Sequence, residues 1–317
     1  MTDLFGRNIT YLRLSVTELC NLRCRYCMPA EGVCKKAHEE MLTQEEMIMA
    51  VRAAASLGVT KLRITGGEPL VKPNIVELCR EAAAVPGIQE LCLTTNGTLL
   101  PKLAEPLRAA GVQRLNISLD TLNEEKFRYI TRVGSLREAL QGIEAASAAG
   151  FEKIKINTVL IGGFNDGEIP ALAELTLRYP VDVRFIELMP MVDSPDFEPE
   201  AFLPNRVVIE KMPRLQPLPE DGGVARLYQF PGALGRVGLI SPVSAHFCAA
   251  CNRIRITADG RIKPCLHAAD EFSIKGLGAE EMKQALREAI LSKPKWHGEL
   301  SYTEHSRARR SMNQIGG

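Results

Sequence analysis

The sequence predicts an α/β fold: a partial parallel β/α barrel of six strand–helix units, followed by a smaller C-terminal α+β domain. Short apolar runs alternate with amphipathic stretches from residue 11 to about residue 189. This alternation is typical of parallel strands joined by right-handed crossovers. Six units are too few for a closed eight-fold barrel, and the chain becomes rich in proline and acidic residues after Met189. We therefore expect one domain over residues 1–190 and a second over residues 191–317.

The expected elements follow in order along the chain. Strands are expected over residues 11–16, 61–65, 90–94, 114–118, 155–160 and 182–188. Helices are expected over 43–57, 73–85, 102–110, 136–149 and 167–178, the first of them opened by a capping box of Thr43 and Glu46. The second domain should contain a short helix over 205–212, antiparallel strands over 224–230 and 236–240, a hairpin joining 253–257 to 261–263, and a helix over 279–291.

Several expected strands have one apolar and one polar face. In the first strand Leu12, Leu14 and Val16 alternate with Arg13 and Ser15, whereas parallel strands covered on both faces are usually apolar throughout. Solvated edge strands are the alternative, but four of them do not fit in one parallel sheet. The pattern therefore indicates a wet, ligand-filled interior. No GxGxxG sequence follows a strand, which disfavours a dinucleotide-binding sheet.

Charge and hydropathy exclude several classes of protein. Lys and Arg number 39 against 38 Asp and Glu, for a net charge of +1, which does not indicate binding to nucleic acid or to a membrane surface. No signal peptide is evident. The longest uncharged stretch, 237–252, is shorter than the ~20 apolar residues of a membrane helix. A cytoplasmic protein is expected.

Nine cysteines are many for such a protein, and a reducing compartment argues against disulfides. Cys79 and Cys92 lie in apolar segments and are expected to be buried thiols. Cys34 has no evident role. The other six form two triplets, which indicates metal binding: Cys20, Cys24 and Cys27, then Cys248, Cys251 and Cys265.

Thiolates suit iron–sulfur clusters or zinc. Zinc in the first triplet would need Cys34 or His38 as a fourth ligand, and the spacing of that triplet favours a cluster. At the second triplet His246 or His267 could complete a zinc site, so spacing alone leaves zinc and iron–sulfur equally open.

The first triplet resembles the signature of the radical S-adenosylmethionine superfamily, and the Gly66-Gly67-Glu68-Pro69 sequence resembles its GGEP motif. Residues 251–260 with Cys265 closely resemble the GTP 3′,8-cyclase family, which acts first in molybdenum cofactor biosynthesis. That resemblance covers nearly the whole chain. Its other motifs are Arg13 and residues 94–97, 116–120, 155–157, 184–190 and 316–317.

The resemblance implies two 4Fe–4S clusters, one on each cysteine triplet, with the second in a C-terminal auxiliary-cluster domain. S-adenosylmethionine would contact Tyr26, Gly67, Ser118 and Met189. GTP would contact Arg13, Arg63, Thr94, Lys155, Arg253, Ile254 and Arg255. Gly316 and Gly317 would act in the active site. The product, (8S)-3′,8-cyclo-7,8-dihydroguanosine 5′-triphosphate, would pass to cyclic pyranopterin monophosphate synthase. The electron donor is not indicated, and a homodimer is compatible with the sequence.

Six cations support an anionic substrate independently of the resemblance, since arginine forks match phosphate oxygens and no Walker A loop is present. They lie on or beside strands that would face one cavity: Arg13, Arg63, Lys155, Arg184, Arg253 and Arg255. Two alternatives remain open at this point. One is another radical enzyme with an auxiliary cluster, and the other is a non-catalytic metal-binding protein.

Overall fold

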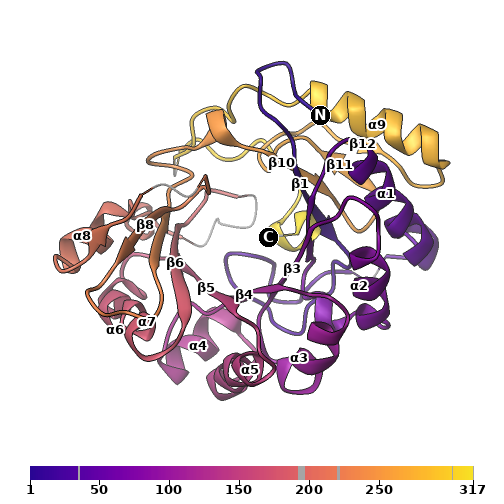
Figure 1. Cartoon of the computed structure of the whole chain (residues 1–317). Helices are drawn as coiled ribbons and strands as arrows, with labels where there is room; N and C mark the ends of the chain where they lie inside the picture. Colours follow the sequence, from indigo (N-terminus) through magenta and orange to yellow (C-terminus); the bar gives the residue numbers. More distant parts are fainter. Residues whose placement is uncertain (35, 192–196, 220–221, 302, 317) are drawn as a thin grey trace.

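Parallel strands curve into an open ring in the computed structural model, which describes residues 1–34, 36–191, 197–219, 222–301 and 303–316 (Figure 1). Each of the first six strands pairs in parallel with the next. Their bounds are β1 (Tyr11–Ser15), β2 (Lys61–Thr65), β3 (Glu90–Thr95), β4 (Arg114–Ser118), β5 (Lys153–Leu160) and β6 (Val181–Glu187). The predicted six-unit partial barrel is confirmed, and the described sheet does not close.

The C-terminal part of the chain extends this sheet at both edges. β9 (Val237–Ile240) pairs in parallel with β6, and β10 (Arg253–Ile256) pairs in parallel with β1. The remaining strands pair antiparallel: β7 (Gln216–Pro217) with β8 (Arg226–Gln229), β8 with β9, and β10 with β11 (Arg261–Lys263), then β12 (Phe272–Ser273). The expected hairpins are therefore present. The division of the chain at residue 190 stays a prediction, because strands from beyond it hydrogen-bond to β1 and β6.

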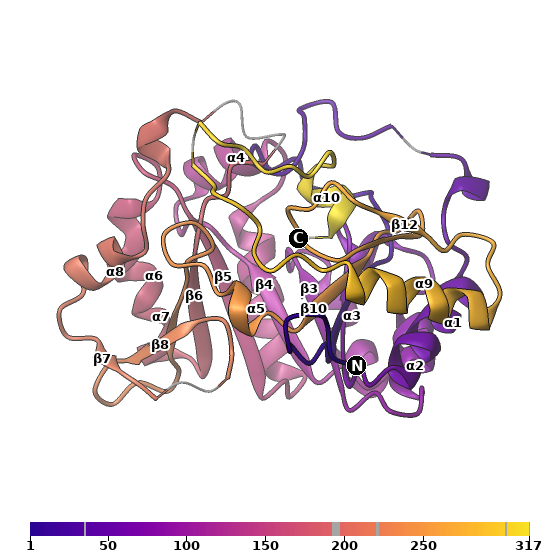
Figure 2. The same ribbon diagram turned by 90° about the horizontal axis from the view of Figure 1, so that it is seen from above.

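Helices cover the outside of the ring (Figure 1). They are α1 (Gln44–Ser56), α2 (Ile75–Ala83), α3 (Leu100–Ala109), α4 (Glu124–Thr131), α5 (Leu136–Ala148), α6 (Ile169–Ala173), α7 (Leu175–Arg178) and α8 (Arg206–Lys211). α9 (Ala279–Leu291) lies beside α1 in both views, and α10 (Met312–Ile315) is near the chain end (Figure 2). Short 3₁₀ turns are η1 (His38–Glu40), η2 (Pro69–Val71), η3 (Asp166–Glu168), η4 (Pro199–Ala201) and η5 (Cys248–Ala250).

One helix prediction was wrong, and one helix was missed. The single helix expected over 167–178 is three pieces, η3, α6 and α7; Pro170 lies in the first turn of α6, where its missing N–H needs no partner. α4 was not predicted, although Asn123 caps it by accepting a hydrogen bond from the Lys126 amide at 3.0 Å. No helix among the described ranges is long and apolar enough to cross a membrane.

The alternation along the strands divides core from cavity. Leu12 and Leu14 are completely buried in the apolar core, and Arg13 between them lines the interior cavity. Leu62 and Ile64 repeat this arrangement around Arg63 on β2. The predicted polar interior is therefore confirmed, and Arg13 and Arg63 are available to a ligand.

The capping box of α1 forms as predicted and ties this helix to the segment before α9. The Thr43 hydroxyl accepts from the Glu46 amide at 3.2 Å, and Glu46 accepts from the Thr43 amide at 2.8 Å. Glu46 also accepts from Lys275 at 2.8 Å and from the Gly276 amide at 2.9 Å.

Removing the Thr43 hydroxyl should lower the free energy of unfolding. Thr43→Ala leaves the Glu46 amide without its cap, and we expect a loss of about 1 kcal/mol. Anaerobic urea denaturation followed by circular dichroism would measure it. Arg52→Ala, at an exposed position of the same helix, is the control and should change stability by less than about 0.5 kcal/mol. Equal effects of the two substitutions would contradict the capping role.

Candidate active site

One cavity of about 590 Å³ occupies the interior of the ring, and both cysteine triplets open into it. Its walls come from the parallel strands, the loop after β1, and the segments that carry the second triplet. Nearly all predicted site residues that the structure describes line this cavity: Arg13, Cys20, Cys24, Tyr26, Cys27, Arg63, Gly67, Thr94, Ser118, Lys155, Met189, Cys248, Cys251, Arg253, Arg255 and Cys265. Segments as far apart in the sequence as Arg13 and Cys265 thus meet at one site.

The loop with the first triplet is held by the end of α4. The Arg23 and Arg25 amides donate to the carbonyls of Thr131 and Ile130 at 3.0 and 2.9 Å. Arg132, which has a positive φ of 60°, donates to the carbonyls of Arg23 and Met28 at 2.9 and 3.0 Å. The helix that the sequence did not predict therefore fixes the position of these cysteines.

The thiols of the first triplet fit a metal cluster by their chemistry. Burial raises the pKa of Cys20 to about 11 and raises that of Cys24 well above its usual value, with the neighbouring Cys27 adding to the second shift. Thiolates in such surroundings need a positive partner, which a bound metal supplies. Among the described residues no three His, Cys, Asp or Glu side chains converge as closely as one metal ion requires; ligands of a cubane stand farther apart.

The two glycines of the GGEP segment pack against the chain that leads into the first triplet. A Cβ on Gly66 would lie 2.6 Å from the Thr17 carbonyl oxygen, and one on Gly67 would lie 2.6 Å from that of Glu18. The amides of Gly67 and Glu68 donate to the carbonyls of Thr17 and Leu19, both at 2.8 Å. Glycine is required here for a close approach of two main chains.

Glu68 connects this segment to the loop after β3. Its carboxylate accepts from the Thr95 hydroxyl at 2.8 Å and the Asn96 amide at 2.7 Å. Burial raises the pKa of Glu68 to about 7, although hydrogen bonds from Asn96 and Leu70 act against it. Motifs 66–69 and 94–97 therefore form one connected wall.

Tyr26 and Asp120 form a second connection across the cavity. The Tyr26 hydroxyl donates to Asp120 at 2.6 Å, and the other carboxylate oxygen accepts from the Val159 amide at 2.8 Å. Burial raises the pKa of Asp120 to about 6. The sequence included Asp120 only within a motif and missed this tie to the first triplet.

The cations meet as predicted, and they repel one another. Arg63 donates to the Tyr11 hydroxyl and, at 3.1 Å, to Thr94. Burial lowers the pKa of Arg255 to about 10, and the charge of nearby Arg253 adds to this shift. Burial lowers the pKa of Lys155 to about 7, and the positive charges of Arg184 and Arg114 add to this shift. A site in which buried like charges lower each other's pKa is suited to a multiply charged anion.

The second triplet is surrounded by cations and imidazoles. Burial alone would raise the pKa of Cys251, but Lys293 and Arg253 outweigh it and lower that pKa. Buried Lys293 donates to the carbonyls of Arg253 and Pro264 at 2.9 and 2.7 Å, and Arg7 donates to the Cys248 carbonyl at 3.0 Å. Neither Lys293 nor Arg7 was predicted, because nothing local in the sequence distinguishes them from surface cations.

Three histidines lie beside this triplet. The ring of His297, also missed by the sequence, lies 4.9 Å from that of His267 and 5.5 Å from that of His246. Burial lowers the pKa of His267 to about 3, and the charges of His297 and Arg255 add to this shift. Its Nδ1 is 3.0 Å from the Ser306 hydroxyl, which connects this wall to the C-terminal tail, residues 306–316.

The tail enters the interior of the ring (Figure 1), and Met312 lines the cavity. Gly316 is buried with a φ of 83°, and its carbonyl accepts from Arg255 at 2.7 Å. A Cβ at this position would lie 3.0 Å from that of Ser15 and would overlap the Thr65 hydroxyl. The prediction that any Cβ would clash here is confirmed for Gly316; Gly317 lies outside the described residues.

Two further outcomes concern single residues. The side chain of Ile254 is 1% exposed and lies in the apolar core on the opposite face of β10, so it does not line the cavity. Because the strand alternates, Ile254 could reach substrate only through its main chain, and its role in substrate binding stays a prediction. Cys79 and Cys92 are fully buried as expected, and Cys34 is exposed.

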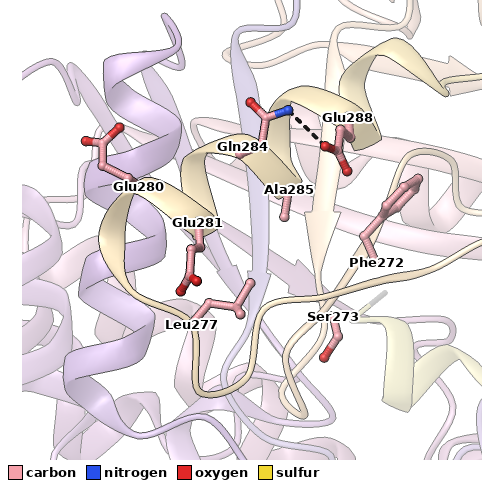
Figure 3. Close-up of a pocket in the computed structure, with 8 residues that line it drawn as sticks. All are labelled: Phe272, Ser273, Leu277, Glu280, Glu281, Gln284, Ala285 and Glu288. Carbon is pink, nitrogen blue, oxygen red and sulfur yellow. Dashed lines mark hydrogen bonds between the residues drawn. The ribbon is translucent and has the colours of Figure 1, made fainter.

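A second, open hollow lies between α9 and β12 (Figure 3). Phe272, Leu277 and Ala285 lie beside its exposed acidic residues Glu280 and Glu281. None of the predicted site residues lines it, so the chemistry belongs to the interior cavity.

Comparison with known proteins agrees with this geometry. Residues 14–176 match the Radical SAM superfamily, and residues 181–299 match Molybdenum Cofactor Synthesis C. The chain is 48% identical to a GTP 3′,8-cyclase of Alkaliphilus oremlandii and 46% identical to one of Moorella thermoacetica, over the whole of both chains in each case.

The chain belongs to the GTP 3′,8-cyclase family. Among solved structures, SuiB of Streptococcus suis bound to S-adenosylmethionine is similar with a TM-score of 0.67, 16% identity, and coverage of 92% of this chain and 67% of SuiB. That likeness supports the fold. Family membership is decided by the cyclases, which extend over both cysteine triplets.

The lowered pKa of Lys155 makes anion binding in this family member dependent on pH. Above pH 7 the neutral amine of Lys155 must take up a proton before it can pair with an anion. For one group with a pKa of about 7, the affinity for the anion should therefore fall roughly fivefold between pH 7 and pH 8. Below pH 7 this contribution should level off. Calorimetry with tripolyphosphate in two buffers of different ionisation enthalpy would measure the uptake.

Lys155→Arg is the control, since arginine stays protonated in this range. The variant should bind tripolyphosphate without the extra proton uptake. Subtracting its pH profile from that of the wild type removes the contribution of the ligand's own titration. An identical pH dependence in both proteins would contradict the assignment to Lys155.

Proposed function

We propose that this chain catalyses the radical cyclisation of GTP to (8S)-3′,8-cyclo-7,8-dihydroguanosine 5′-triphosphate, the first step of molybdenum cofactor biosynthesis. The observation that carries the proposal is one cavity onto which two cysteine triplets and a set of buried cations open. Family membership supports S-adenosylmethionine and a 4Fe–4S cluster as cofactors and GTP as substrate.

The first triplet would hold the cluster through Cys20, Cys24 and Cys27. When bound, this cluster and S-adenosylmethionine supply the one-electron chemistry that yields a 5′-deoxyadenosyl radical. Tyr26, Gly67, Ser118 and Met189 would bind S-adenosylmethionine, all of them on the cavity wall. The hydrogen bond between Tyr26 and Asp120 would keep that wall rigid while the substrate reacts.

The cations would hold the triphosphate of GTP. Arg13, Arg63, Lys155, Arg253 and Arg255 line the cavity, and Thr94 is fixed by its hydrogen bond with Arg63. Positioning matters most here, because the ribose C3′ must bond to C8 of its own guanine. The walls of the cavity would exclude water from the radical species.

The second triplet would hold a second 4Fe–4S cluster through Cys248, Cys251 and Cys265. The lowered pKa of Cys251 supports a thiolate ligand at this position. Since three cysteines leave one iron without a cysteine ligand, that iron would face the substrate in the shared cavity.

Iron analysis tests the two sites separately. Wild-type protein reconstituted anaerobically should hold about eight irons and eight sulfides, four of each per cluster. Cys24→Ala should abolish S-adenosylmethionine cleavage, and Cys251→Ala should spare much of it while stopping cyclisation of GTP. Cys34→Ala removes an exposed thiol outside both triplets and should keep all eight irons. A stable protein with one zinc and one cluster would rule out the second assignment.

Gly316 should be needed for product formation. Gly316→Ala places a Cβ against Ser15 and Thr65, so the tail must move away from Arg255, and we expect at least a tenfold loss of cyclised product with both clusters retained. Gly232→Ala is the matched control, because Gly232 also has a positive φ, 77°, but open space around it. Product analysis by liquid chromatography would compare them. Full activity of Gly316→Ala would show that the tail has only a structural role.

A further inference from the structure

A half-buried ion network holds the start of the C-terminal tail. Arg310 donates through Nε and Nη2 to the two oxygens of Glu271, at 2.7 and 2.9 Å. Its remaining nitrogen, Nη1, donates to Asp259 at 2.8 Å and lies 3.9 Å from Glu18. One guanidinium thus binds carboxylates from three separate segments, which a lysine cannot do with the same geometry.

The charges of this network balance. Lys36 lies 2.7 Å from Glu18 and 2.9 Å from Asp259, and Lys263 lies 3.2 Å from Glu271. Three carboxylates therefore face three cations. Arg310 is 16% exposed and Glu18 is 5% exposed, so these pairs are less screened than surface ion pairs. Burial works to raise the pKa of Asp259, but hydrogen bonds from Lys36, Thr257 and Arg310 lower it to about 2.

The chain between Arg310 and Gly316 has little freedom to slide. Ser311 and Gln314 form a capping box at the start of α10. Buried Asn313 donates to the Glu18 carbonyl at 3.1 Å, two residues before the first cysteine. Ile315 packs in a small apolar cluster with Met191 and Ala308. The position of Arg310 therefore sets which residue arrives beside Arg255.

The residue that arrives there must lack a Cβ. Gly316 fits against Ser15 and Thr65 only because it is glycine. A shift of one residue toward the cavity would bring Ile315 to this place. The network thus has to fix the register of the tail as well as its general location.

We propose that Arg310 is a positioning residue for the cyclisation: its fork on Glu271 and Asp259 fixes the register that places Gly316 against Arg255. The inference rests on the proposed function, because it concerns the same cavity. The residues that Arg310 binds also border both cysteine triplets. Glu18 precedes Cys20, and Asp259 and Glu271 flank the segment that holds Cys265.

The test uses the full chain with both clusters reconstituted. In Arg310→Ala, hydrogen exchange at amides 313–316 should be at least tenfold faster, because α10 loses its anchor. Deoxyadenosine formation and iron content should stay within twofold of wild type, while cyclised product falls at least tenfold. The amount of deoxyadenosine per product therefore rises. Arg309→Ala removes an exposed neighbouring charge, and it should change neither the hydrogen exchange of the tail nor the amount of cyclised product.

Arg310→Lys should be intermediate in tail exchange and in product yield, because lysine keeps the positive charge but lacks the forked guanidinium group. Wild-type behaviour of Arg310→Lys would overturn the role of the fork. Unchanged tail exchange in Arg310→Ala, or a parallel loss of iron, deoxyadenosine and product, would overturn the proposal altogether. If wild-type protein formed no cyclised product, the proposed function would fail, and the exchange measurement would still decide the role of Arg310.

Discussion

The inside of the ring gathers buried cations whose charges repel one another, and much of the structure serves to tolerate this repulsion. Arg13, Arg63, Arg253 and Arg255 face one cavity from three neighbouring strands, and burial lowers the pKa of Arg13 well below its usual value, with Arg255 adding to the shift. An apolar core outside the strands offsets the cost of this repulsion. The same unfavourable charge makes a triphosphate a strongly preferred occupant.

Cluster ligands and cations come together because parallel strands end at the same edge. The first triplet follows β1, and the GGEP segment follows β2, its neighbour in the sheet. β10 pairs with the other side of β1 and brings Arg253 and Arg255 beside Arg13. Pairing of β10 with β1 therefore joins the part of the cavity that would bind S-adenosylmethionine to the part that would hold GTP.

The sequence predicted the strands well because their alternation is a local pattern. It placed the six cations at one cavity for the same reason, whereas the two triplets were interpreted from their spacing and from the resemblance to a known family. Features that depend on contacts between distant segments were not predictable: β9 and β10 at the two sheet edges, the clamp of α4 on the first triplet, and Lys293 near the second. A motif names neighbouring residues together, while a strand turns their side chains to opposite faces, so the motif did not show that the Ile254 side chain lies in the core.

The tail brings a main-chain carbonyl, and no acidic side chain, to the buried cation Arg255. A carboxylate side chain on the tail would pair with Arg255 and occupy phosphate space. A main-chain carbonyl is a neutral acceptor, and on a glycine it carries no further bulk. The charged residues of the tail remain outside, where Arg310 binds carboxylates and Arg307 and Arg309 are exposed. Charge therefore anchors the tail through Arg310, and the small size of Gly316 allows its carbonyl to meet Arg255.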